Sequence, residues 1–211
     1  MPKVSEEHKE ARKRQILEAA VYCFAEKGFH PTTMQDICKR AELSPGAVYL
    51  YFPGKEQLIE ALVDFLHEMN QQSFVRIRKG KDLRESLEAA FDLFFTDENQ
   101  QEKATEGKAS MAQDIVTRLD VMFLAEAIRS DSFRNKFIKA TDRNGKLYHE
   151  LIAEAQAAGI IKTEWSAEAI GDMIESIYFS LALSTTVNPS RSFGEHRKMV
   201  KAMIIKTFFT E

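Results

Sequence analysis

Residues 28–58 read GFHPTTMQDICKRAELSPGAVYLYFPGKEQL, and this stretch decides the fold. Thr32 and Thr33 belong to a residue type that caps helix N-termini, and apolar residues follow them at helical spacing. Ser44-Pro45 then starts another helix, because serine is a favoured cap and proline suits the first helical position. Pro53-Gly54 ends that helix. The stretch therefore predicts two short helices joined by a tight turn, which is a helix-turn-helix.

Helical spacing of apolar residues continues on both sides of this stretch. Glycine and proline number only nine and five in the 211 residues, and most of them fall between the periodic segments. No segment alternates apolar and polar residues as a strand does, so the predicted fold class is all-α. Besides a short helix after Thr33, we expect helices over about 5–27, 45–51, 55–79, 81–96, 111–129, 131–158, 166–187 and 192–209. The polar residues 97–108 are expected to form a solvated loop.

These helices are expected to form two domains. Residues 1–54 make an N-terminal three-helix domain that carries the helix-turn-helix. Residues 55–211 make a second helical domain, linked to the first through the helix at 55–79. Residues 1–55 carry a net charge of +2 and the remainder −5, so the overall charge of −3 conceals a mildly basic N-terminal part. This charge excludes only a uniformly basic nucleic-acid binder.

Composition and motifs exclude several other classes of protein. With 44% hydrophobic and 29% charged residues, the chain is neither disordered nor fibrous. The N-terminus lacks the apolar segment of a secretory signal, and no run of about 18 apolar residues occurs, so we expect a cytoplasmic protein with no membrane partner. No nucleotide-binding, hydrolase or metal motif is present, so we expect neither an enzyme nor a cofactor or metal site. Cys23 and Cys38 are expected to be reduced core thiols, with a redox role as the alternative.

Three helix starts carry more specific signals. Thr33 with Asp36, or Thr32 with Gln35, resembles a capping box. Ser166 is expected to cap a helix, with Trp165 and Ile170 packed together as a hydrophobic staple, although Trp165 could instead stack on a ligand. Ser192 and Glu195 form the third signal, a capping box for the last helix.

The helix at 45–51 has the chemistry of a surface that approaches DNA. Tyr49 and Tyr51 are expected to be exposed, whereas Val48 points inward. Gly46 and Ala47 are almost free of side chain, which would let the helix come close to base edges. Hydroxyl groups, a lysine ammonium and the N–H groups at a helix start all suit phosphate. The alternative is a small helical core in which both tyrosines are merely half-buried.

The stretch resembles the N-terminal domain of the TetR family, which are bacterial one-component transcription regulators. The shared pattern is a glycine, a Thr-Thr helix start, Ile-x-x-x-Ala, then Ser-x-Gly-x-apolar-Tyr-x-Tyr-Phe and a following lysine. Two positions depart from the pattern. Glu42 stands where the family commonly has glycine, so the turn must accept a side chain, and Gly54 stands where a serine often caps the next helix.

The resemblance implies a role for each matching residue. Thr33 and Ser44 would bind phosphates, Tyr49, Tyr51 and Lys55 would grip the DNA backbone, and three small residues would face base edges. The full DNA-binding set is Thr32, Thr33, Ser44, Pro45, Gly46, Ala47, Tyr49, Tyr51 and Lys55. A basic cluster of Lys9, Arg12, Lys13 and Arg14 could reach neighbouring phosphates or simply be solvated.

Beyond residue 80 the resemblance weakens. It implies a C-terminal domain that binds a small molecule and pairs two subunits through segments 166–187 and 192–209, although core packing would explain many of the same apolar residues. Candidate ligand-binding residues are Phe65, Met69, Phe91, Phe95, Met111, Phe123, Tyr148, Met173 and Tyr178, although residues of these types at helical spacing more often form a core. Asn144, His149, Asp172 and Glu175 could orient a ligand or face solvent.

These observations predict a ligand-responsive transcriptional regulator with three partners: a double-stranded DNA operator, a small-molecule effector of unknown identity, and a second copy of the chain. We expect a repressor that a small, mainly apolar effector releases from a palindromic operator. The alternative is a helical small-molecule-binding or scaffold protein without operator function.

Overall fold

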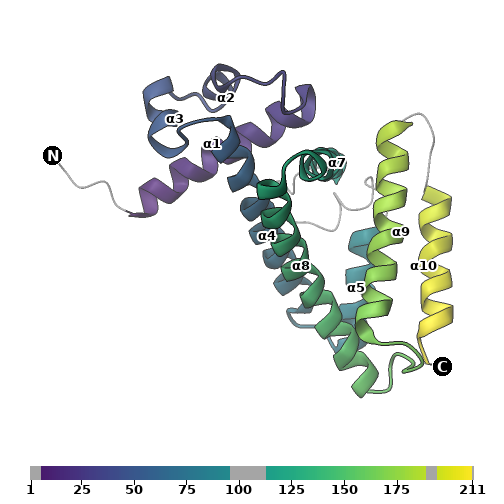
Figure 1. Cartoon of the computed structure of the whole chain (residues 1–211). Coiled ribbons are helices and arrows are strands. Elements are labelled where there is room, and N and C mark those ends of the chain that lie inside the picture. Colours follow the sequence, from purple (N-terminus) through teal and green to yellow (C-terminus); the bar gives the residue numbers. More distant parts are fainter. Residues whose placement is uncertain (1–5, 96–112, 189–193, 211) are drawn as a thin grey trace. The chain divides into compact units, whose positions relative to one another are not determined.

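The computed structural model describes residues 6–95, 113–188 and 194–210, and these residues confirm the all-α prediction (Figure 1). Three helices make up the N-terminal part and a fourth follows at once. They are α1 (Glu6–Lys27), α2 (Met34–Arg40), α3 (Pro45–Tyr51) and α4 (Lys55–Arg78). The remaining helices are α5 (Leu83–Phe95), α7 (Gln113–Arg129), α8 (Asp131–Ala157), α9 (Ala167–Val187) and α10 (Gly194–Phe208).

The chain forms two compact units, and their limits differ from the domains that the sequence suggests. One unit extends to Leu66 and also includes Arg118–Ile138, which lie far away in the sequence. The other comprises His67–Thr117 and Lys139–Glu211. The helices α4, α7 and α8 therefore each contribute residues to both units.

The core of the first unit is rich in aromatic rings. Phe24 meets Phe29 edge to face, with ring centroids 5.0 Å apart. Phe29 in turn lies 5.4 Å from Phe123 of α7, whose ring is 5.9 Å from Phe133 of α8. These side chains are all buried, and offset contacts of this kind add to the free energy gained by burial. The aromatic rings thus join α7 and the start of α8 to the end of α1 within one core.

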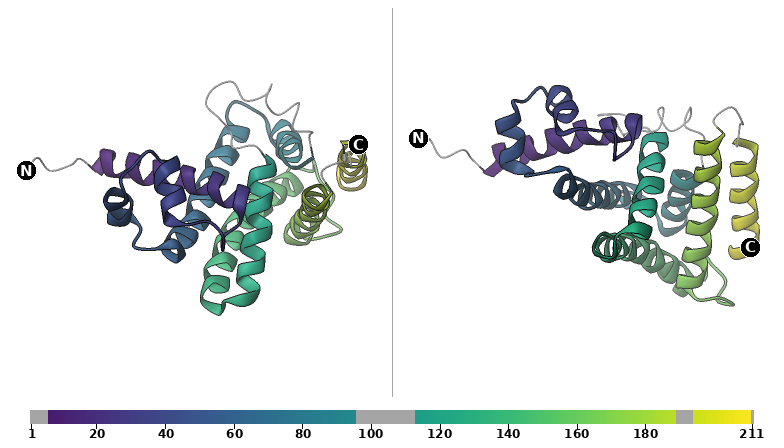
Figure 2. Two further views of the ribbon diagram at one scale, coloured as in Figure 1. Left: turned by 90° about the horizontal axis from the view of Figure 1, so that it is seen from above. Right: turned by 45° about the horizontal axis from the view of Figure 1, so that its top comes forward.

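In the second unit, α9 and α10 lie side by side (Figure 2). One hydrophobic cluster joins residues of α4, α5, α8, α9 and α10, and its largest fully buried members include Phe95, Leu151 and Ile170. Beyond α10, the backbone N–H of Thr210 donates to the Ile160 carbonyl at 2.9 Å, and Ile161 and Phe209 form an isolated antiparallel bridge. This bridge fastens the segment after α10 to the connection between α8 and α9.

Close packing of α8 against α9 depends on one glycine. Gly171 is buried on α9, and a Cβ atom added there would lie 2.3 Å from Cδ2 of His149 on α8. The imidazole of His149 is itself held by an ion pair, because its Nε2 lies 3.0 Å from Oδ1 of Asp172. Any side chain at position 171 would therefore displace the ring from its partner.

Most predicted helix limits are confirmed to within a few residues. Ser166 caps α9 as predicted, and its hydroxyl accepts the Ala169 N–H at 3.1 Å. The predicted staple is not formed, because Trp165 is 62% exposed while Ile170 is buried. The predicted loop at 97–108 and the capping serine, Ser192, lie outside the described residues.

Two further findings bear on the classes of protein that the sequence excluded. No helix in the described part of the chain is long and apolar enough to cross a membrane. Among the same residues, no group of three or more His, Cys, Asp or Glu is placed to hold a metal ion.

Cys23 and Cys38 are both buried, and burial raises the pKa of the Cys23 thiol, so little thiolate is present there at neutral pH.

Candidate nucleic-acid interface

The turn between α2 and α3 has the geometry of a Schellman motif. The Leu43 N–H donates to the Cys38 carbonyl at 3.1 Å, and the Glu42 N–H donates to the Lys39 carbonyl at 3.3 Å. Glu42 occupies the left-handed position of this motif, with φ at 55°. Glycine is the usual residue there because its lack of a Cβ removes the steric penalty. The turn thus accepts the glutamate that departs from the family pattern.

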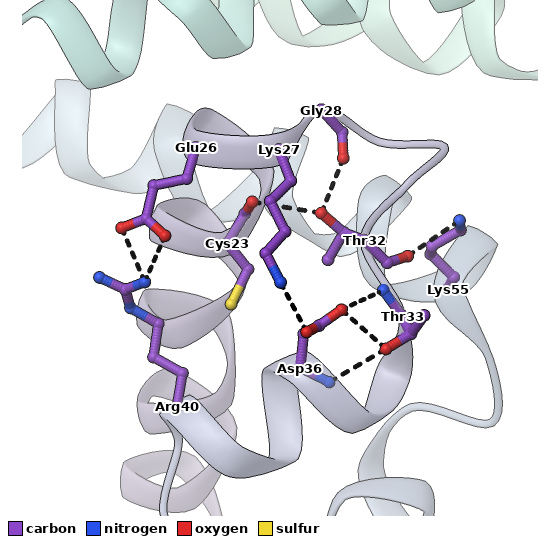
Figure 3. A network of polar contacts seen from close by, with 9 residues as sticks. All are labelled: Cys23, Glu26, Lys27, Gly28, Thr32, Thr33, Asp36, Arg40 and Lys55. Carbon is purple, nitrogen blue, oxygen red and sulfur yellow. Dashed lines mark hydrogen bonds and ion pairs between the residues drawn. The ribbon is translucent and has the colours of Figure 1, made fainter.

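Thr33 starts α2 with a complete capping box (Figure 3). Its hydroxyl accepts the Asp36 N–H at 3.1 Å, and the Asp36 carboxylate accepts the Thr33 N–H at 2.9 Å. The same carboxylate lies 2.6 Å from the Lys27 ammonium. Hydrogen bonds from Lys27 and then from Thr33 hold the pKa of Asp36 well below its usual range. Of the two capping boxes that the sequence allows, the one between Thr33 and Asp36 is formed.

Thr32, in contrast, lies inside the first unit (Figure 3). Its hydroxyl donates to the backbone of α1, with the Gly28 carbonyl at 2.7 Å and the Cys23 carbonyl at 3.2 Å. A side chain that is fully buried and engaged in this way is not available to phosphate. The structure therefore corrects the prediction for Thr32, whose side chain fixes the turn between α1 and α2.

Lys55 reaches back to the same turn. Its ammonium donates to the His30 carbonyl at 2.9 Å and to the Thr32 carbonyl at 3.1 Å. An ammonium group has three N–H donors, so one remains for another acceptor. Lys55 thus joins the start of α4 to the segment that leads into α2.

The third helix presents an almost purely apolar surface between two tyrosines. Val48 is buried, as predicted, and so is Phe52, whereas Tyr49 is 48% exposed and Tyr51 is half-buried rather than exposed as predicted. Ser44 caps the helix, with its hydroxyl 3.3 Å from the Ala47 N–H. Pro45 and Gly46 are exposed. Two of the three predicted base-facing residues therefore lie on the surface of the first unit, and the third, Ala47, is half-buried.

The basic residues at the start of α1 are largely paired within that helix. Lys9 lies 2.7 Å from Glu6, and Arg14 lies 2.8 Å from Glu18. Both pairs are exposed, so water and salt weaken them. A phosphate could therefore compete for these cations at small cost.

One part of the site, at the end of α7, was not predicted from the sequence. The end of α7 contacts the turn between α1 and α2, where Arg129 lies 2.5 Å from Nε2 of His30 and Glu126 lies 4.0 Å from the same atom. These residues are almost a hundred positions from His30, and no local pattern links them. Together with the ring of Phe123 on Phe29, they support the turn that leads into α2.

The structure divides the predicted ligand-binding residues between the two units. Phe65 and Phe123 are buried in the first unit. Phe91 and Phe95 are buried in the second, where Tyr148 packs edge to face on Phe74. Met69 is half-buried, Tyr178 is half-buried and packs against the core of the second unit, and Met173 is exposed on α9. Met111 lies outside the described residues.

Three of the four polar residues predicted to orient a ligand already have partners within the second unit. Oδ1 of Asn144 pairs with Nδ1 of the buried His67, and His149 pairs with Asp172, another of the four. The geometry therefore gives these three residues a structural role in holding neighbouring helices.

Comparisons with known proteins bear on the N-terminal part most directly. The family model for bacterial regulatory proteins of the tetR family matches residues 16–62. An uncharacterized HTH-type transcriptional regulator of Bacillus subtilis, YfiR, is 44% identical over 63 residues, which are 30% of this chain and 31% of the relative. An HTH-type transcriptional repressor of Mycobacterium tuberculosis is 45% identical over 62 residues, or 29% of this chain and 33% of the relative. The chain thus spans about a third of the length of these curated relatives.

Similarity of fold extends much further. A transcriptional regulator from Saccharomonospora viridis, solved in complex with choline, superposes with a TM-score of 0.76 at 18% sequence identity. The match covers 96% of this chain and 100% of that one. At this identity the likeness shows the fold alone. The helix-turn-helix geometry, the family model and the curated relatives agree, and residues 16–62 of the chain match the N-terminal domain of the tetR family of bacterial regulatory proteins.

Proposed function

We propose that the chain is a ligand-responsive transcriptional regulator that binds a palindromic DNA operator as a homodimer. In this proposal it represses transcription in the cytoplasm, and a small, mainly apolar molecule releases it from DNA. The observation that carries the proposal is the surface of α3, a capped helix with small exposed residues between two tyrosines. In the same unit, hydrogen bonds of Thr32 and Lys55 fix the turn that leads into α2.

In the proposed complex, α3 enters the major groove and its flanks contact the backbone. Tyr49 and Tyr51 offer hydroxyl groups to phosphates on either side, and Ser44 and Thr33 lie at the helix starts. The third N–H of the Lys55 ammonium remains for a phosphate. Thr32 is not part of this contact set, because its hydroxyl is buried.

Exposed apolar side chains on the last two helices support a homodimer. Met173, Leu183 and Val187 are exposed on α9, and Met199 and Met203 are exposed on α10. On each helix these residues fall on one side, because a helix turns by about 100° per residue. Two copies could bury both faces in a four-helix interface. A two-fold dimer would present two α3 helices to two half-sites, which is why we expect a palindromic operator.

Release by an effector would act through helices that both units share. The helix α4 contributes Lys55 to the first unit and His67 to the second, so a change in its position would alter the packing of both units. An effector can shift this equilibrium only if it binds one arrangement more tightly than the other. We propose that the arrangement it favours separates the two α3 helices by a distance that no longer fits the operator.

Binding of the full chain to DNA from upstream of its own gene tests the proposal. We expect a site-specific complex that weakens as salt rises, because basic groups displace counterions from phosphates. Tyr49→Phe removes one exposed hydroxyl and should weaken the complex, whereas Tyr22→Phe is a matched control, because that ring stacks on Arg40 within the domain. A chain that forms no salt-sensitive, site-specific complex would contradict the regulator proposal.

The dimer and the effector need separate measurements. Sedimentation should show a dimer at micromolar concentration, and a monomer there would count against the paired model. A thermal-shift screen of small molecules should find ligands that also dissociate the DNA complex. Ligands that stabilise a chain unable to bind DNA would instead support the alternative of a helical small-molecule-binding protein.

A further inference from the structure

A single large apolar side chain stands at the centre of the exposed surface of α3. Leu50 is 80% exposed, more than any other large apolar side chain in the described part of the chain. At about 100° per residue, Leu50 lies between Gly46 and Ala47 around the helix, and the buried Val48 lies nearly opposite. Leu50 therefore projects in the direction in which α3 faces away from its own domain.

The two tyrosines flank Leu50 on either side. Tyr49 and Tyr51 are its neighbours in sequence, so each lies about 100° around the helix from it. The central surface, made of Gly46, Ala47 and Leu50, has no side chain that donates or accepts a hydrogen bond. The hydroxyl at the helix start, that of Ser44, already accepts the Ala47 N–H. Recognition by this central surface must therefore rest on shape and apolar contact.

Because Gly46 has no side chain, nothing projects from the helix at this position beside Leu50. A Cβ atom added at Gly46 would meet no atom of the chain within 4 Å, and its backbone conformation is one that other residues adopt. Neither packing nor backbone geometry within the domain requires glycine at this position. The open space beside Leu50 is thus available to a partner that approaches the helix closely.

Only one base of unmodified DNA offers an apolar group in the major groove, namely thymine with its C5-methyl group. We infer that Leu50 is a specificity-determining residue that contacts a thymine methyl group in each half-site of the operator. Against cytosine, the same side chain would cover the N4 amino group without accepting its hydrogen bond, which penalises the wrong base. The inference rests on the proposed function and adds to it the chemical group that α3 recognises.

The test begins with the full chain and a pool of random double-stranded DNA, from which the bound sequence is selected. Each thymine of one half-site is then replaced by uracil, which removes the methyl group and keeps every hydrogen-bonding group. Fluorescence anisotropy measures the affinity of the wild type, Leu50→Ala, Leu50→Met and Leu124→Ala. Leu124 is an exposed leucine on α7 in the same unit, so it is the matched control.

At one or two thymine positions, uracil should weaken wild-type binding by about fourfold, the effect of losing one buried methyl group. At the same positions uracil should leave the affinity of Leu50→Ala unchanged. Leu50→Met, which keeps an apolar side chain of similar volume, and Leu124→Ala should both retain the wild-type response.

Three results would overturn the inference. If Leu50→Ala responds to uracil as the wild type does at every position, or if the wild type responds at none, Leu50 does not read a methyl group, although the regulator proposal stands. If selection enriches no sequence, the proposed function fails and the inference fails with it.

Discussion

The two compact units hold their helices by different means. In the first unit, side chains reach across to backbone carbonyls: Thr32 and Lys55 fix the turn before α2, and Gln15 of α1 donates to the Ala41 carbonyl at 2.8 Å. In the second unit, similar contacts occur where α8, α9 and α10 meet, and the polar contacts between α4 and α8 include an exposed ion pair and the hydrogen bond of the buried His67 to Asn144. The ion pair joins Arg78 to Glu154 at 2.6 Å.

This difference corresponds to what each unit would have to do. A side chain bonded to a backbone carbonyl fixes the geometry of a turn, and α3 needs a fixed geometry to fit a groove. Exposed ion pairs contribute little free energy and are screened by salt. The ion pair between Arg78 and Glu154 would therefore break at small cost if α4 and α8 changed their packing, whereas the hydrogen bond of the buried His67 to Asn144 would cost more to break. The predictions below test whether the first unit is the more tightly fixed of the two.

The largest effect is expected at the aromatic core of the first unit. Phe123→Ala should lower the free energy of unfolding by about 3–5 kcal/mol, because it leaves a cavity among Phe29, Phe133 and Phe137. Urea denaturation measures the loss, and hydrogen exchange should show faster opening of residues 28–33. Ile128→Ala, an exposed position on the same helix, is the control and should have little effect. Equal losses from the two variants would refute the assigned packing.

Thr32→Val should cost about 1–3 kcal/mol, because two carbonyls near the end of α1 lose their hydroxyl partner. The variant keeps the shape of the side chain, so the folded fraction should bind DNA as the wild type does. Urea denaturation and anisotropy together separate these effects. A variant of normal stability that binds DNA poorly would restore Thr32 to the contact set.

Glu42→Gly should stabilise the chain by about 0.5–1 kcal/mol, because glycine adopts the left-handed conformation without a steric penalty. Thermal unfolding measures the gain. Glu42→Ala removes the charge but keeps the Cβ, so it should give no comparable gain. Stabilisation by both substitutions would show that charge, and not backbone conformation, is the cause.

The smallest effect is expected at the surface of the second unit. Arg78→Gln should cost less than about 1 kcal/mol, and the loss should vanish in concentrated salt, because the pair with Glu154 is exposed. Urea titrations at low and high salt provide the comparison. A larger loss that persists in salt would mean that the second unit is as firmly fixed as the first.

The sequence was most informative where structure depends on neighbouring residues. Both ends of α3 were predicted correctly, because Ser44-Pro45 and Pro53 act through local backbone geometry. The choice between Thr32 and Thr33 could not be predicted in the same way. Adjacent residues of one type carry equal local signals, and only packing decides which hydroxyl is buried.

Contacts between distant segments could not be predicted from the sequence for a related reason. Residues 118–138 belong to the first unit, but nothing in their composition shows that Phe123 lies on Phe29 or that Arg129 meets His30. Leu50 was a different omission. Its place on a helical wheel opposite Val48 could have been read from the sequence, since both positions lie on the correctly predicted helix.

The contact between Gly171 and His149 restricts the order in which these positions can be substituted during evolution. Because a Cβ at position 171 would overlap the imidazole ring, Gly171 cannot gain a side chain while the ring of His149 stays in place. A smaller residue at 149 would have to come first, and it would release Asp172 from its ion pair. Among close relatives we expect these three positions to covary, with alanine at 171 accompanied by a small residue at 149.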